Sequence, residues 1–130
     1  MSEYATQVTI YSDRDALVAA LAKRYAEVEV HEDGAQMLNY YGRESGLAQV
    51  IVRKAHLKQW GTNDLGFTLD PLTGTYSATY DDMYHSAEWF DALNVDYQIA
   101  HYSAVASQLG YAGVSATVTN GVTELEFMMA

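Results

Sequence analysis

The sequence contains no cysteine and only one proline, Pro71. Without cysteine the chain has no disulfide framework, no thiolate zinc site and no cysteine nucleophile.

Lysine and arginine total 7, against 17 aspartates and glutamates, and the formal net charge is -10. A surface of this charge repels nucleic acid, so we expect no nucleic-acid partner. Two interpretations of the acidic balance stay open: it keeps the protein soluble, or it attracts a basic partner or mimics a nucleic acid.

Long apolar runs are also missing. No apolar segment has the length needed to cross a bilayer, and the first six residues lack the pattern of a signal peptide. We therefore expect a cytoplasmic protein with no membrane partner. The 130 residues are 49% hydrophobic, which is enough for one core. We expect a single domain over residues 1-130.

Hydrophobic periodicity predicts helices and strands in a mixed order. A strand is expected over residues 5–11, and Ser12 is expected to cap a helix that carries Leu17, Leu21 and Tyr25. A strand around Val28 and Val30 should end at Asp33-Gly34. Further extended segments are expected at residues 40–41, 48–53, 66–69 and 75–80. A long helix should run from the N-cap Ser86 to Leu109 and stop at Gly110, with a kink or break at residues 94–96.

The C-terminal region carries the clearest local pattern. Asn120-Gly121 lies between two alternating runs, as a two-residue hairpin requires. Pairing outward from this turn places one apolar face on the hairpin, formed by Val114, Ala116, Val118, Thr123, Leu125 and Phe127. The predicted order is then β-α-β-β-β-β-α-β-β. This order is typical of a two-layer α+β domain in which two helical regions cover one face of a mainly antiparallel sheet.

Tyrosine is unusually frequent, with 11 copies. Tyrosine and tryptophan are enriched in binding surfaces, because they bury a large area and keep a polar group. The candidate ligand- or partner-binding residues are Tyr76, Tyr80, Tyr84, Trp89, Tyr97, Arg43 and Arg53. The alternative is that these rings fill the layer between sheet and helices.

Catalytic and metal-binding patterns are absent from the sequence. The four histidines have no paired metal-binding spacing, and the chain has no phosphate-binding glycine loop and no nucleophile elbow. Asp81, Asp82, His85 and Glu88 lie close together in sequence, either as cation ligands or as a solvated turn near a helix N-terminus. We expect no catalytic residue, no bound metal and no cofactor.

Several segments resemble a known family. Gly61-Thr62-Asn63-Asp64-Leu65-Gly66-Phe67 is similar to the Gly-Tyr-Asp-Ile-Gly-Phe stretch of the hypothetical chloroplast open reading frame thirty-five family, a domain of unknown function in cyanobacteria, red-algal plastids and some phages. Other segments match the family in their order along the chain: the N-terminal strand, residues 76–81, Trp89-Phe90, Leu109-Gly110-Tyr111 and the closing hairpin. The chain departs from the family at Asp96, where an arginine is usual, and at Met83 and Tyr84, where tryptophans are usual. The resemblance implies a fold more than a function.

These observations favour a binding or adaptor protein that acts through contacts with a protein partner or with copies of itself. The alternative is a small-ligand or nucleotide-binding protein with an aromatic pocket between the sheet and the long helix. An enzyme is the third class, and no motif supports it.

Overall fold

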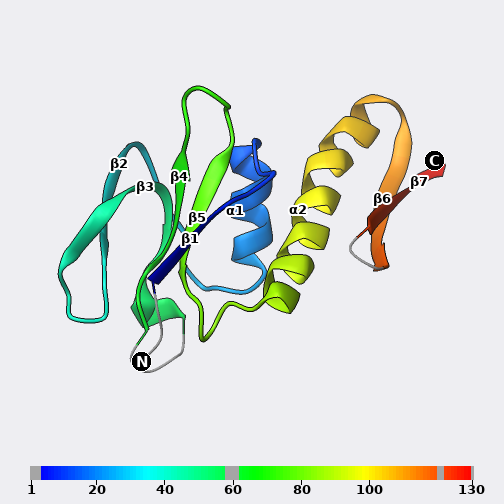
Figure 1. Cartoon of the computed structure of the whole chain (residues 1–130). Helices are drawn as coiled ribbons and strands as arrows, with labels where there is room; N and C mark the ends of the chain where they lie inside the picture. The colour runs from blue at the N-terminus through cyan, green and yellow to red at the C-terminus, as the bar shows by residue number, and fades with distance from the viewer. Residues whose placement is uncertain (1–3, 58–61, 120–121, 130) are drawn as a thin grey trace. The chain divides into compact units, whose positions relative to one another are not determined.

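The computed structural model describes residues 4–57, 62–119 and 122–129. The chain divides into two compact units, one formed by Met1–Ser12 and Ala22–Ser86, the other by Asp13–Leu21 and Ala87–Ala130. The expectation of a single domain stays a prediction. Helices and antiparallel sheets together make the predicted α+β fold, with elements in the predicted order (Figure 1). The stacking of both helices on one sheet face stays a prediction.

The first unit is a five-stranded antiparallel sheet in the order β1-β5-β4-β3-β2. Its strands are β1 (Tyr4–Val8), β2 (Glu29–Leu38), β3 (Glu44–Val52), β4 (Leu65–Leu69) and β5 (Tyr76–Asp81), and the short 3-10 helix η1 (Lys54–His56) follows β3. The central strands β3 and β4 carry runs of apolar residues, and Val50, Ile51 and Phe67 are fully buried. The buried residues of this unit therefore concentrate on its inner strands, and both faces of β3 are covered there.

The path of β2 corrects two expectations. β2 does not end at Asp33-Gly34 but continues to Leu38, with a shift of register between Val30 and Ala35. Gly34 lies in the β-bulge at this register shift and takes a left-handed backbone conformation, with φ of 84°. Tyr40 and Tyr41 form a turn between β2 and β3 instead of an extended segment.

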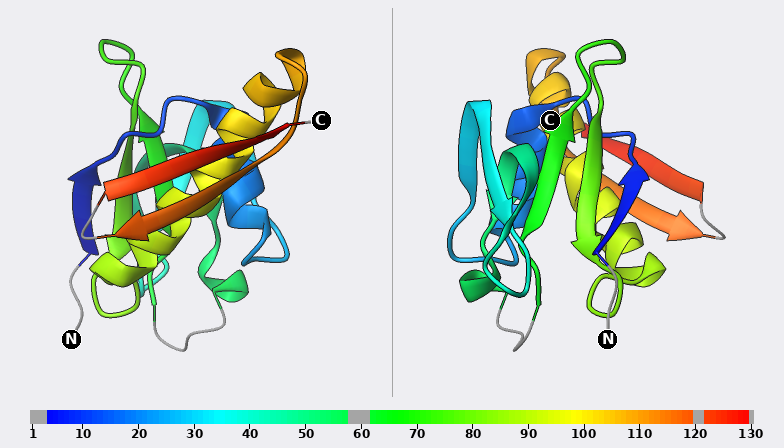
Figure 2. Two further views of the ribbon diagram at one scale, coloured as in Figure 1. Left: turned by 90° about the vertical axis from the view of Figure 1, so that its right-hand side faces the viewer. Right: turned by 60° about the vertical axis from the view of Figure 1, so that its left-hand side comes forward.

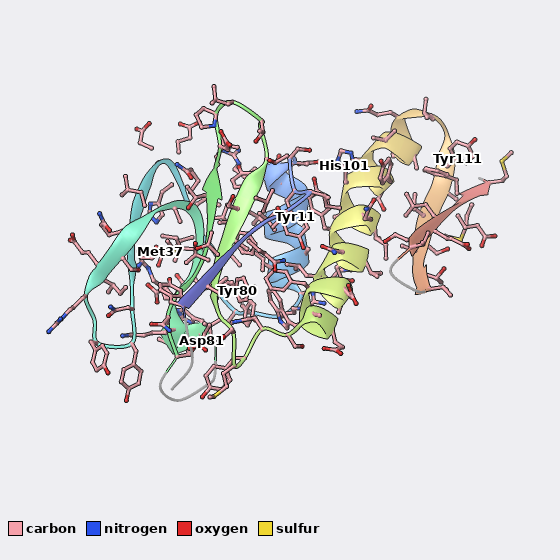
Figure 3. The ribbon with its side chains drawn as sticks, viewed as in Figure 1. Tyr11, Met37, Tyr80, Asp81, His101 and Tyr111 are labelled. Atoms are coloured by element: carbon pink, nitrogen blue, oxygen red, sulfur yellow. The ribbon has the colours of Figure 1, made fainter. Side chains whose placement is uncertain are left out.

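Gly66 shows why the centre of the sheet needs a glycine. A Cβ at this position would overlap Sδ of Met37 and would lie 3.1 Å from Cβ of Ala48. Met37, labelled in Figure 3, and Ala48 are themselves buried, together with Ile51. Gly66 therefore serves close packing of the Met37 side chain on β4.

The second unit contains α1 (Arg14–Ala22), α2 (Ala87–Gln108), β6 (Tyr111–Thr119) and β7 (Val122–Met129). The N-cap of α1 is Asp13 and not Ser12, because Oδ1 of Asp13 accepts the backbone N–H of Ala16 at 3.1 Å. α2 runs without interruption through residues 94–96, so the expected break is wrong. It stops before Gly110, which takes the left-handed φ of 87° typical of a residue after a helix.

The predicted register of the C-terminal hairpin is confirmed. Val114 pairs with Phe127, Ala116 with Leu125 and Val118 with Thr123. The connecting Asn120-Gly121 lies outside the described residues. Burial on the apolar face is less complete than expected: Val114 is buried, Leu125 is half-buried and Phe127 is 39% exposed.

Candidate binding surface

A buried carboxylate organises one end of the sheet in the first unit. Asp64, immediately before β4, is 1% exposed. Its carboxylate accepts the backbone N–H groups of Leu38 and Lys54, both at 2.8 Å, and Nη1 of Arg53 at 3.0 Å. Three donors compensate the loss of water around this charge. Asp64 therefore ties the end of β2 and the start of η1 to β4.

Arg53, one of the candidate partner-binding residues, belongs to this network. Its Nε donates to Glu29 at 3.0 Å, and its Nη1 also donates to the backbone oxygen of Gln36 at 2.8 Å. The Arg53 hydrogen bond lowers the pKa of Glu29, while the two carboxylates raise the pKa of Arg53. The guanidinium is thus engaged by its own chain, which favours a role in holding the sheet end together.

Asn63 links a second buried carboxylate to the β2–β3 turn. Its Nδ2 donates to Oδ2 of Asp81 at 3.0 Å, and its Oδ1 accepts the backbone N–H of Tyr40 at 2.6 Å. Asp81, at the end of β5, is fully buried and also accepts the hydroxyl of Thr62 at 3.3 Å (Figure 3). Every buried side-chain nitrogen and oxygen in the described ranges has a hydrogen-bond partner.

The β2–β3 turn, residues 39–43, is held on its other side by Asn39 and Lys54. Oδ1 of Asn39 accepts the backbone N–H groups of Tyr41 and Arg43, both at 3.0 Å. Nζ of Lys54 donates to the backbone oxygen of Asn39 at 3.0 Å. Gly42 closes the turn at φ 77°. The turn is therefore fixed by its own Asn39 and by hydrogen bonds from two other segments, at Lys54 and Asn63.

This turn presents two aromatic rings to solvent. Tyr40 is 42% exposed and Tyr41 is 63% exposed. The two rings meet edge to face, with centroids 5.0 Å apart. Arg43, another candidate residue, is exposed on the same turn. We call residues 39–43, with Lys54, the aromatic turn.

The other candidate aromatic residues differ in burial. Tyr76 and Tyr97 are buried, whereas Tyr80, Tyr84 and Trp89 are half-buried. The hydroxyl of Tyr80 donates to Oε1 of Gln7 at 3.0 Å. Tyr76, Tyr80 and Tyr84 belong to the first unit, and Trp89 and Tyr97 to the second. Their grouping into one pocket stays a prediction.

Asp81 and His85, two of the candidate cation ligands, lie at the end of β5 and in the turn that leads from it to α2. Oδ1 of Asp81 accepts the backbone N–H of Met83 at 3.2 Å, so both carboxylate oxygens are engaged by the protein. His85 is buried, its Nδ1 lies 3.3 Å from the backbone oxygen of Asp81, and burial lowers its pKa. Among the described residues, no three potential ligands gather around one point. The arrangement matches a structural turn.

Sequence reasoning missed a hydrogen bond between two side chains in the second unit. Nδ1 of His101 lies 2.8 Å from Oδ2 of Asp13, and the hydroxyl of Tyr97 accepts the backbone N–H of Asp13 at 3.0 Å. The hydrogen bond with His101 lowers the pKa of Asp13. The two partners are 88 positions apart, so no local spacing could reveal them. This cluster joins the N-terminus of α1 to α2.

Comparison with known proteins found no matching family, no matching curated protein and no matching solved structure. The resemblance to the hypothetical chloroplast open reading frame thirty-five family therefore stays a prediction. In the described ranges, neither helix combines the length and apolar character needed to span a membrane.

Proposed function

We propose that this protein is a binding or adaptor protein, and that the aromatic turn is a contact surface for a protein partner. The observation that carries the proposal is the pair of exposed rings on a rigid turn. Binding energy at interfaces concentrates in a few aromatic anchors, and tyrosine loses little conformational entropy on contact. The hydrogen bonds of Asn39, Asn63 and Lys54 hold the turn before a partner arrives, which lowers the entropic cost of binding.

A capture experiment tests this proposal. The variant Tyr40→Ala/Tyr41→Ala should lose proteins that the unaltered protein retains from native lysate, with an unchanged melting temperature. Leu72→Ala is a matched control, because Leu72 is 94% exposed on a different turn. Retention of the same proteins by all three forms would refute the aromatic turn as the contact surface.

A nucleotide-binding role is the second candidate. Nζ of Lys54 lies 3.5 Å from the backbone oxygen of Tyr40, which places a positive charge beside the exposed tyrosines. Aromatic faces with a nearby cation stack bases and hold phosphate. Native mass spectrometry separates the two candidates, because a retained nucleotide would add a discrete mass that Tyr41→Ala should remove.

A further inference from the structure

The hairpin of the second unit has an outer strand edge at β7. β6 and β7 form a sheet of only two strands, and among the described residues no third strand pairs with β7. The backbone of α2 runs close to β6 rather than β7. Figure 2 draws this hairpin in orange and red beside α2. Every second N–H and C=O group of an edge strand points away from its neighbour, and such a row is a template for another strand. The outer edge of β7 therefore has the chemistry to accept one.

The side chains of β7 leave apolar area in contact with water. On the face opposite to Glu124 and Glu126, Phe127 is 39% exposed and Met129 is 81% exposed. A two-stranded hairpin is only marginally stable by itself, whereas a third strand adds both hydrogen bonds and cross-strand contacts. An added strand would thus cover apolar surface that the hairpin alone leaves open.

The charges on β7 indicate what kind of strand fits. Glu124 and Glu126 are exposed on the face that also carries Ser115 and Thr117, with Ser115 paired to Glu126 and Thr117 to Glu124. A depression of about 220 Å³ on this face is lined by these four residues and Leu125. Opposite charges on neighbouring strands stabilise pairing, so the added strand should carry lysine or arginine beside both glutamates.

A second copy of the chain fits this edge poorly. Antiparallel pairing of β7 with another β7, centred on Leu125, places Glu124 directly opposite Glu126 of the second copy. Like charges in this position destabilise a sheet, and the net charge of -10 adds repulsion between copies.

We infer that the outer edge of β7 accepts an extended segment of another protein in which basic and apolar residues alternate. The added strand continues the sheet, its basic side chains contact Glu124 and Glu126, and its backbone pairs with β7. This is recognition by strand addition, in which main-chain hydrogen bonds give affinity and alternate side chains give specificity. The surface shares no residue with the aromatic turn, so it stands independently of the proposed function.

Synthetic peptides test the charge preference. A fluorescent peptide of alternating lysine and valine should bind the full chain at least about tenfold more tightly than a peptide of alternating glutamate and valine. The variant Glu124→Lys/Glu126→Lys should reverse this preference, and both positions are exposed, so the fold should tolerate the change. Equal affinity of the lysine peptide for the unaltered protein and the variant would overturn the inference.

A second comparison uses the unaltered protein and separates strand addition from simple charge attraction. Two lysine–valine peptides carry methyl groups on their backbone nitrogens, one peptide at every lysine and the other at every valine. In an extended strand, alternate N–H groups point to opposite edges, so each peptide is blocked along one edge. Both peptides have the same charge, but each keeps N–H groups on one edge only. Strand addition predicts that the two differ in affinity by at least about tenfold. Equal binding would overturn it, and so would a dimer in sedimentation experiments that the lysine peptide does not dissociate.

Discussion

The side-chain oxygen Oδ1 of Asn63 accepts the backbone N–H of Tyr40 at 2.6 Å, across 23 positions of the chain. This hydrogen bond fixes the exposed β2–β3 turn to the buried segment that precedes β4. The same Asn63 side chain donates to the fully buried Asp81. One amide therefore connects a buried carboxylate to the surface that we propose for partner binding.

Replacing this amide should destabilise the first unit. Asn63→Ala leaves the Tyr40 N–H and a carboxylate oxygen of Asp81 each without one partner, and Asn63 is only 6% exposed. Loss of partners for buried polar groups costs about 1–3 kcal/mol. Urea unfolding should show this loss, while the exposed control Leu72→Ala should change the unfolding free energy by less than about 0.5 kcal/mol. Similar values for the two variants would mean that Asn63 does not hold the network.

The contact between Gly66 and Met37 predicts a coupled pair of substitutions. Gly66→Ala forces a methyl group onto the Met37 side chain, and overpacking of this kind costs about 1–3 kcal/mol. Shortening the neighbour in Gly66→Ala/Met37→Ala should remove the overlap. The double variant should therefore lose less stability than the sum of the two single variants, measured as a double-mutant cycle by thermal unfolding. Additive losses would show that the added methyl group finds space without moving Met37.

Local patterns predicted most elements of the fold, and long-range contacts explain where they failed. The alternation on both sides of Asn120-Gly121 predicted the hairpin register, because a hairpin is specified by neighbouring residues. The turn at Tyr40 and Tyr41 was not predicted, because its hydrogen bonds come from Asn63 and Lys54, far along the chain. The prediction of Arg53 as a binding residue also fails to account for long-range contacts. Nothing near it in sequence reveals the bonds to Glu29 and Asp64.

The hairpin faces predict unequal effects of neighbouring substitutions. Leu125 is half-buried beside Ala116, whereas Glu124 is on the opposite, exposed face. Leu125→Ala should cost about 1–2 kcal/mol, below the range for a fully buried leucine, because part of its side chain already meets water. Glu124→Ala should cost less than about 0.5 kcal/mol. Chemical unfolding checks this, and a larger loss for Glu124→Ala would contradict the assignment of the two faces.

The ion pair between Arg53 and Glu29 predicts part of the acid sensitivity of the fold. The hydrogen bond from Arg53 lowers the pKa of Glu29 below its ordinary value of 4.5, so the folded state binds a proton at Glu29 less readily than the unfolded state. The stabilisation is complete above this ordinary value and is lost as pH falls through the lower folded pKa.

Urea unfolding measured in steps from neutral pH to about pH 3 should therefore give a shallower loss of stability for Glu29→Gln than for the unaltered protein. Glu32→Gln is the matched control, because Glu32 is exposed on the same strand. This control should keep the slope of the unaltered protein. A Glu29→Gln profile parallel to that of the control would show that Glu29 and its partners Arg53 and His31 add nothing to the acid sensitivity.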